Sequence, residues 1–155
     1  MKKINLIIWS FCAVLSISAQ NSTPVKVEAA FAKEYKATQG TTWMNFNKSG
    51  KYFALQQESA SAMKIISYNN EGTKLFTGDV VSFSSVSDNM SAFLKERFVE
   101  PSQPSESNYN LERTFKTQLD NQPVEAAILN FKGESKYLIL YFDASGTLIK
   151  REILE

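Results

Sequence analysis

The most constraining stretch of the chain is Ser135–Ile153, where two apolar runs flank a short segment that contains Gly146. This pattern is typical of a β-hairpin. The chain repeats it, because Ala62–Thr77 carries apolar residues at matching positions 74 residues earlier, with Gly72 aligned to Gly146. We therefore predict that the chain contains two copies of one structural unit.

Each copy is predicted to open with a helix. Thr23–Lys36 places mostly apolar side chains on one helical face, with Thr23 as the N-cap and Pro24 at the first helical position. A second helix is predicted from Ser85 to about Phe98, and four β-rich runs follow each helix. The predicted strands are Thr41–Asn47, Lys51–Gln57, Met63–Asn69 and Thr73–Phe83 in the first copy, and Asn108–Leu119, Val124–Phe131, Lys136–Asp143 and Thr147–Leu154 in the second.

The predicted fold class is α+β. Two tandem helix-plus-four-strand repeats, about residues 23–83 and 84–155, form one antiparallel sheet with both helices on one face. A lipocalin-like barrel is the alternative, disfavoured because each half opens with a helix. Glu100–Ser107 contains two prolines, three serines and no apolar residue, so we expect an exposed, mobile loop there.

The first 19 residues have the pattern of a secretory signal peptide. Lys2 and Lys3 precede an apolar run, and Ser18 and Ala19 supply small residues before Gln20. The apolar run is too short for a membrane span of roughly 20 residues. We expect cleavage after Ala19, a single domain at residues 20–155, periplasmic or secreted localisation, and no membrane insertion after cleavage.

Charge and cysteine content narrow the possible partners. The mature chain would keep 15 basic and 16 acidic residues, a net charge of −1, with no basic run longer than Lys150-Arg151. Nucleic acid is therefore excluded as an expected partner. Cys12, the only cysteine, lies in the leader, so the mature chain has no disulfide, thiol nucleophile or thiolate metal site.

The sequence supplies no catalytic constellation. Histidine, the commonest general base and metal ligand, does not occur in the chain. Ser61 and Lys64 match an S-x-x-K motif, but residues three apart on a strand point to opposite faces, so this match is fortuitous. The carboxylates are scattered. We expect no enzyme, no cofactor and no metal site.

The order of elements resembles the PepSY-like bacterial periplasmic domains, also described as β-lactamase-inhibitor-like. The resemblance is carried by core and turn positions across the mature chain: Ala30-Phe31 with Lys33 and Tyr35, Trp43, Gly50-Lys51-Tyr52, and the hairpins around Gly72 and Gly146. It departs from the family pattern where Lys36, not proline, follows Tyr35, and where Phe115 or Thr117 replaces a second tryptophan. The resemblance implies a long antiparallel sheet with helices on one face, and a role in binding or inhibiting proteins.

Two helices can cover only one face of an eight-stranded sheet, so the other face becomes the candidate site. If the helices cover Phe53, Leu55, Ile66, Leu138, Leu140 and Phe142, an apolar, tyrosine-rich face is left open. The candidate partner-binding residues on that face are Tyr52, Met63, Ile65, Tyr137, Ile139 and Tyr141. The alternatives are that these side chains pack on one another, or that the Glu100 loop covers them.

Two functions follow from this face. The first is a noncatalytic protein-binding module, an inhibitor or modulator of an envelope hydrolase, with an envelope protein as its partner. The alternative is a periplasmic carrier that holds a small apolar or peptide ligand in the concavity of the sheet.

Overall fold

A computed structural model describes residues 22–35, 40–99 and 108–155. The predicted leader, its cleavage site after Ala19, and the loop predicted at Glu100–Ser107 lie outside these residues.

The described residues form eight strands, two α-helices and two short helical turns. All eight strands belong to one sheet, in which each strand pairs antiparallel with its neighbour in sequence. This confirms the α+β class and the single antiparallel sheet, whereas the tandem-repeat origin of the two halves stays a prediction. The elements are α1 (Val25–Glu34), β1 (Thr41–Phe46), β2 (Lys51–Gln57), β3 (Met63–Asn69), β4 (Lys74–Val81), η1 (Phe83–Ser85), α2 (Asp88–Leu94), η2 (Lys95–Val99), β5 (Tyr109–Leu119), β6 (Gln122–Phe131), β7 (Tyr137–Phe142) and β8 (Leu148–Leu154).

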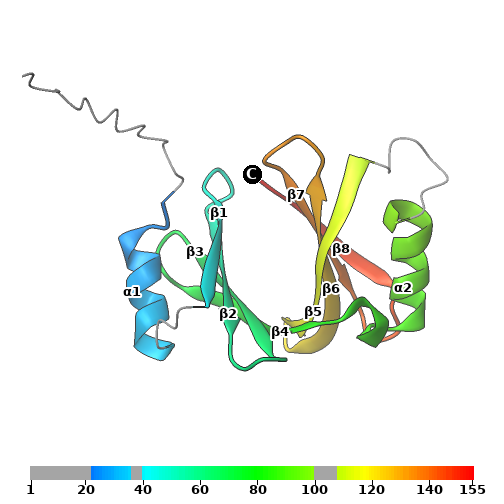
Figure 1. The fold of residues 1–155 in the computed structure, drawn as a ribbon, viewed down its shortest axis with the longest axis horizontal. Coiled ribbons are helices and arrows are strands. Elements are labelled where there is room, and N and C mark those ends of the chain that lie inside the picture. The colour runs from blue at the N-terminus through cyan, green and yellow to red at the C-terminus, as the bar shows by residue number, and fades with distance from the viewer. Residues whose placement is uncertain (1–21, 36–39, 100–107) are drawn as a thin grey trace, which may run out of the picture.

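The sheet curls so that its two halves face one another. Figure 1 shows β1–β4 rising on one side and β5–β8 on the other, with α1 and α2 at the two outer ends. The halves join through β4 and β5, which pair over three residues only, Asp79–Val81 with Thr114–Lys116. Gly78 precedes this seam, and a Cβ there would lie 2.8 Å from the Lys116 carbonyl oxygen, so a side chain would push β4 and β5 apart.

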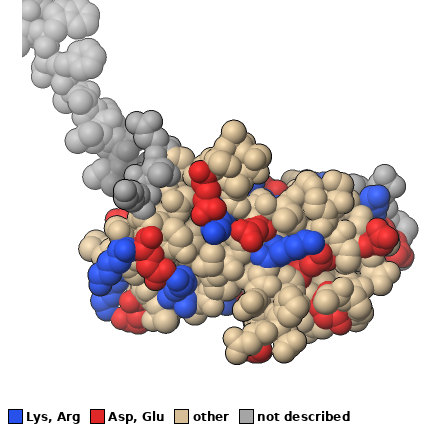
Figure 2. All heavy atoms as spheres, turned by 90° about the horizontal axis from the view of Figure 1, so that it is seen from below, with Lys and Arg blue, Asp and Glu red and all other residues tan. Residues whose placement is uncertain are grey.

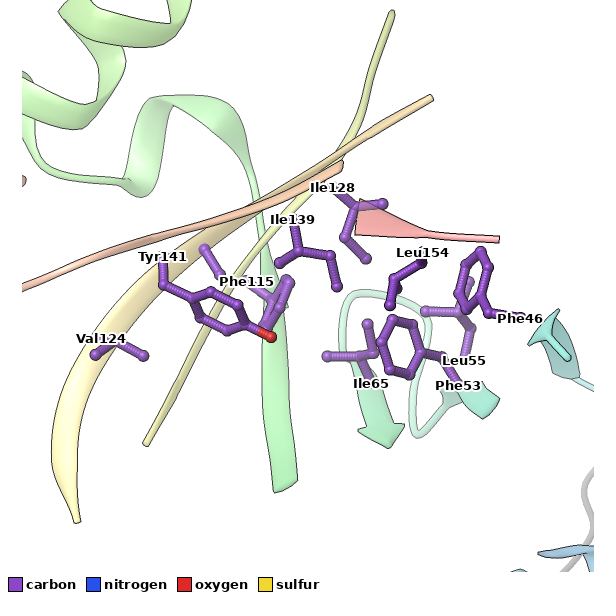
Figure 3. Packing of buried hydrophobic residues seen from close by; sticks show 11 residues of the cluster. Phe46, Phe53, Leu55, Ile65, Phe115, Val124, Ile128, Ile139, Tyr141 and Leu154 are labelled. Carbon is purple, nitrogen blue, oxygen red and sulfur yellow. The ribbon is translucent and has the colours of Figure 1, made fainter. Parts of the chain in front are cut away.

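An apolar cluster fills the space between the two halves. Both halves contribute to this inner cluster, as Figure 3 shows for Phe46 and Phe53 from one half and Ile139 and Tyr141 from the other. Ring contacts cross between the halves, with centroids 5.1 Å apart for Phe46 and Tyr137. The inner cluster consists of Phe46, Phe53, Leu55, Ile65, Phe115, Val124, Ala126, Ile128, Ile139, Tyr141 and Leu154.

Each helix packs against the opposite side of its own half. Val27 and Phe31 of α1 are buried with Tyr52, Ala54, Ile66 and Tyr68. Met90 and Leu94 of α2 are buried with Ala127, Leu129, Leu140 and Phe142, and Leu138 packs at the margin.

The prediction for β2 is therefore wrong, because Phe53 and Leu55, expected beneath a helix, belong to the inner cluster. The alternation along β2 is present, but its two faces are exchanged. Tyr52 to Gln56 are all buried, so β2 has no solvent-facing side whose polar residues would show which face meets the helix.

Polar contacts close the mouth between the halves, where the β1–β2 turn meets the end of β8. The Ser49 amide donates to the Glu155 carbonyl oxygen at 3.2 Å, and the Glu155 amide donates to Ser49 Oγ at 2.9 Å. Lys51 on β2 forms an ion pair with Glu152 on β8. These contacts hold the sheet in its curled form.

The helix starts differ in detail from their predictions. Pro24, not Thr23, is the N-cap of α1, because Thr23 Oγ1 instead donates to Asn45 Oδ1 of β1 at 3.0 Å. At α2, the N-cap Ser87 makes no side-chain capping bond, and its amide donates to Glu125 Oε2 at 2.8 Å. Each helix start is thus tied to a strand of its own half.

Candidate binding surface

The six residues predicted to bind a partner do not form an open face. Ile65, Ile139 and Tyr141 are buried in the inner cluster, with exposed fractions of 0%, 0% and 3%. Met63 and Tyr137 are half-buried at its margin. Tyr52 lies on the other side of the sheet, beneath α1, and is 4% exposed.

The structure therefore brings five of the six together, but between the halves of the sheet instead of on its surface. The sequence left open whether these side chains face solvent or pack on one another, and in the structure the five pack within or against the inner cluster. The inner cluster fills the concavity of the sheet in which a small ligand was expected to bind.

The polar groups at the inner cluster have structural contacts. Tyr141 donates to Glu152 Oε2 at 3.4 Å, and Glu152 is also paired with Lys51. Burial raises the pKa of the Tyr141 phenol well above its ordinary value, and the nearby Glu152 carboxylate adds to this shift. A phenol with so high a pKa stays protonated, and here it serves as a hydrogen-bond donor inside the core.

Among the described residues, no three side chains of Asp, Glu, His or Cys lie close enough together to hold a metal ion. The S-x-x-K match is likewise separated, because Ser61 precedes β3 whereas Lys64 lies in β3 and pairs with Glu58 at 3.3 Å.

Open surface with binding character lies instead around the β5–β6 turn, at the lower end of the second half in Figure 1. Leu119 and Gln122 pair across a two-residue connection, Asp120-Asn121. Both connecting residues have left-handed φ values, 52° and 61°, as a tight type I′ hairpin turn requires. This turn forms a narrow, exposed tip.

A groove lies on each side of this tip. Groove A, of about 480 Å³, runs between the β5–β6 and β7–β8 turns and is lined mainly by Leu119, Pro123, Val124, Ala144 and Ile149. Groove B, of about 550 Å³, lies where β4 and β5 diverge beyond their short ladder and is lined by Leu75, Phe76, Thr77, Thr117 and Gln118. Asp120 borders both grooves, and we call the tip and the two grooves the hairpin site.

The hairpin site exposes apolar side chains. Ile149 in groove A is 50% exposed and Leu75 in groove B is 44% exposed, two of the four large apolar side chains that stand exposed among the described residues. Figure 2, seen from the side of this turn, shows acidic and basic residues interspersed, with wide uncharged areas between them. The site thus offers apolar contact area, and the charges around it are of both signs.

The rim of groove A is rigid and charged. Asp143 Oδ1 accepts hydrogen bonds from Ser145 Oγ at 2.6 Å and from the amides of Ser145 and Thr147 at 2.9 and 3.0 Å. These bonds, led by that of the Ser145 hydroxyl, lower the pKa of the Asp143 carboxyl below its ordinary value. Asp143 is thus ionised at neutral pH and holds the β7–β8 turn in one conformation.

Sequence reasoning missed the hairpin site. Asp120-Asn121 between two β-rich runs is a recognisable two-residue turn, and Pro123 just after it indicates an open strand end. The flanking grooves have no such signal, because groove A depends on how two turns lie side by side in the folded sheet and groove B on the divergence of β4 and β5.

No protein-family model matches the chain, and no curated protein matches it. Solved structures with a similar arrangement include a DUF2874 family protein from Bacteroides ovatus, 18% identical, with 85% of this chain and 88% of that chain covered and a TM-score of 0.45. A candidate periplasmic protein from Bacteroides eggerthii is 15% identical over 85% of this chain and 89% of its own, with a TM-score of 0.47. A BLIP-like protein from Bacteroides fragilis is 17% identical over 83% and 84%, with a TM-score of 0.40. Similarity at this level assigns neither a family nor an activity to this chain.

Proposed function

We propose that this protein is an exported, noncatalytic module that binds another protein through the hairpin site. The observation that carries the proposal is the exposed β5–β6 tip with a groove on either side, since the face expected to bind is buried. A narrow tip between two grooves suits a partner that has a cleft of its own. An envelope hydrolase has such a cleft, and the protein would then act as its inhibitor or modulator.

The apolar side chains of the site supply binding energy. Burying Ile149 and Leu75 against a partner would remove from water two side chains that are now half exposed, at roughly 25 cal/mol for each Å² of apolar surface buried. Interfaces of this kind have an apolar centre and a polar rim. In the hairpin site Asp120, Gln122 and Ser145 supply that rim.

The tip has little conformational entropy to lose on binding. The Asp120-Asn121 turn is fixed by the ladder between β5 and β6, which extends to the Leu119–Gln122 pair beside it. The neighbouring β7–β8 turn is fixed by the hydrogen bonds to Asp143. A surface that is ordered before binding keeps more of its contact energy as affinity.

Export and family membership belong to the same proposal. The leader at residues 1–19 supports secretion with cleavage after Ala19, and the described residues contain no helix that could span a membrane. The pattern around Trp43, Gly72 and Gly146 supports a PepSY-like domain of two tandem repeats with both helices on the outer side of the curled sheet. Gly72 and Gly146 support the repeat, because a Cβ on either would lie under 3 Å from the backbone of the helix in its own half.

The alternative function, carriage of a small apolar or peptide ligand, now has a different location. The concavity holds the inner cluster, and both grooves have volumes within the range of ligand pockets, roughly 300 to 1,000 Å³. Apolar side chains line most of groove A, whereas polar residues line most of groove B. A carrier would therefore use groove A alone, without groove B.

The test is capture from periplasmic extract by the immobilised protein, with identification of the bound protein and calorimetry on the purified pair. We expect Ile149→Asp and Leu75→Asp each to weaken binding by about tenfold or more, or 1.4 kcal/mol. Val25→Asp is the control, because Val25 on α1 is 80% exposed and lies outside both grooves.

Equal binding by all three variants would exclude the hairpin site. If Ile149→Asp instead releases a small molecule that native mass spectrometry finds on the wild type, and Leu75→Asp does not, the protein is a carrier.

A further inference from the structure

The free edge of β8 differs from the other free edge of the sheet. At the β1 edge, Thr23 from the segment before α1 bonds to Asn45. β8 pairs with β7 on one side, and no strand of the described chain pairs with its other side. A free edge presents main-chain donors and acceptors that can pair with another strand.

The β8 edge also exposes apolar side chains. Ile153 is 68% exposed and Ile149 50% exposed, and Lys150 and Arg151 between them are exposed as well. Soluble proteins usually protect an edge with charges or a bulge. Here a register shift at Tyr141/Phe142 leaves Ile149 without a partner on β7, and Lys150, Arg151 and Glu152 place charges at the centre of the edge. Ile149 and Ile153 nevertheless stay exposed on either side of these charges.

The sequence of β8 is symmetric about its central residue, with the same apolar residues at mirrored positions and opposite charges at Lys150 and Glu152. Leu148–Leu154 reads Leu-Ile-Lys-Arg-Glu-Ile-Leu, with Arg151 at its centre. In an antiparallel pair of two such strands related by a two-fold axis at Arg151, Ile149 faces the second copy's Ile153, and Lys150 faces the second copy's Glu152. Each contact occurs twice, as two-fold symmetry requires. The Ile149–Ile153 pairs are favourable apolar cross-strand contacts, and each Lys150–Glu152 pair brings a cation of the second copy to a carboxylate that Lys51 and Lys150 of its own chain already approach.

We propose that the partner of the β8 edge is a second copy of this chain, and that two sheets join through β8 with a two-fold axis at Arg151. Ile149 to Ile153 supply a ladder of five residue pairs, against the three that join the two halves of the sheet at β4 and β5. The pairing ends before Glu155, whose main chain is bonded to Ser49.

One contact in this dimer is unfavourable. Arg151 faces the second copy's Arg151 across the axis, and like charges directly opposite each other weaken a strand pair. Arg151→Thr is therefore expected to tighten the dimer.

Cross-linking tests the position of the axis. Paired residues on antiparallel strands have Cα atoms about 4.5 to 5.5 Å apart, within the range of about 4.4 to 6.8 Å that a disulfide spans. In a Cys12→Ser background, we expect Arg151→Cys to form a disulfide-linked dimer under mild oxidation. Lys74→Cys, exposed on β4, is the control and should stay monomeric.

Sedimentation equilibrium tests the contacts. We expect the wild type to self-associate, and Ile153→Lys and Lys150→Glu each to raise the dissociation constant about tenfold or more, or 1.4 kcal/mol. Leu75→Lys, at an exposed apolar residue of another strand, should leave the dissociation constant unchanged. Circular dichroism melts of each variant report whether the monomer is still folded.

A wild type that stays monomeric from micromolar to millimolar concentration, with no Arg151→Cys cross-link, would overturn the proposal. So would a dimer that Ile153→Lys leaves intact. Neither result bears on the partner site in groove B, because Leu75 takes no part in this contact.

Discussion

Truncation of Tyr141 tests whether the two halves of the sheet enclose a core. Its ring is 3% exposed in the inner cluster, so Tyr141→Ala would leave a cavity the size of a phenol between the halves. Truncation of large buried aromatics costs about 3 to 5 kcal/mol. The hydroxyl adds little, because its bond to Glu152 is long at 3.4 Å. We expect a loss of about 3 to 4 kcal/mol for Tyr141→Ala and about 1 kcal/mol or less for Tyr141→Phe.

Urea denaturation followed by circular dichroism measures this loss. With a slope of about 1 to 3 kcal/mol per molar urea for a small protein, the midpoint of Tyr141→Ala should fall by roughly 1 M or more. Leu140→Ala probes the other face of β7, where Leu140 is 0% exposed beside α2, and should cost about 2 to 5 kcal/mol. Val25→Ala is the control, since Val25 is 80% exposed and should change stability by less than about 0.5 kcal/mol.

The outcome that refutes this reasoning is a stability of Tyr141→Ala close to that of the wild type beside a large loss for Leu140→Ala. The halves would then stand apart in solution, with the inner cluster open to water, and the face predicted from the sequence would be available to a partner. Losses of similar size for both variants mean that β7 is covered on both sides.

Two further predictions concern the seam and the helix start. Gly78→Ala places a Cβ 2.8 Å from the Lys116 carbonyl oxygen, and we expect the free energy of unfolding in the same urea assay to fall by about 1 to 3 kcal/mol. An unchanged midpoint would mean that β4 and β5 can move apart at the seam without a cost in stability. Burial acts to raise the pKa of Glu125, but hydrogen bonds from Ser87 and Lys116 outweigh it and hold the pKa below the ordinary 4.5. The ionised form is therefore favoured in the folded state, so the stability advantage of the wild type over Glu125→Gln should be full above the ordinary pKa and disappear as the pH falls through the lowered one. An advantage that persists in acid would show that charge plays no part in this contact.

The succession of strands was predictable because turn residues mark its boundaries. Gly50, Gly72 and Gly146 all adopt positive φ values in turns between predicted strands. β2, β3 and β6 to β8 agree with their predicted ranges within two residues at each end. Local chemistry determines these positions, and a single sequence contains that information.

The orientation of the strands could not be predicted in the first half. Phe53 and Tyr52 alternate as expected, but both are buried, because one side of the sheet meets α1 and the other meets the opposite half of the sheet. The argument that two helices leave one face open assumed a flat sheet. Curling depends on strand twist and on register shifts such as that at Leu111/Arg113, which no residue type in the sequence marks.

The order of the strands has a consequence for how the chain folds. Every ladder joins consecutive strands, so each hairpin can form as soon as its own residues collapse, at a small cost in loop entropy. Contacts between distant residues join the two halves, in the inner cluster and at the mouth, where Lys51 meets Glu152 across 101 positions and Ser49 meets Glu155 across 106. From this topology we expect each group of four strands to form quickly from local contacts, and the docking of the two halves, which removes water from the inner cluster, to be the slow step.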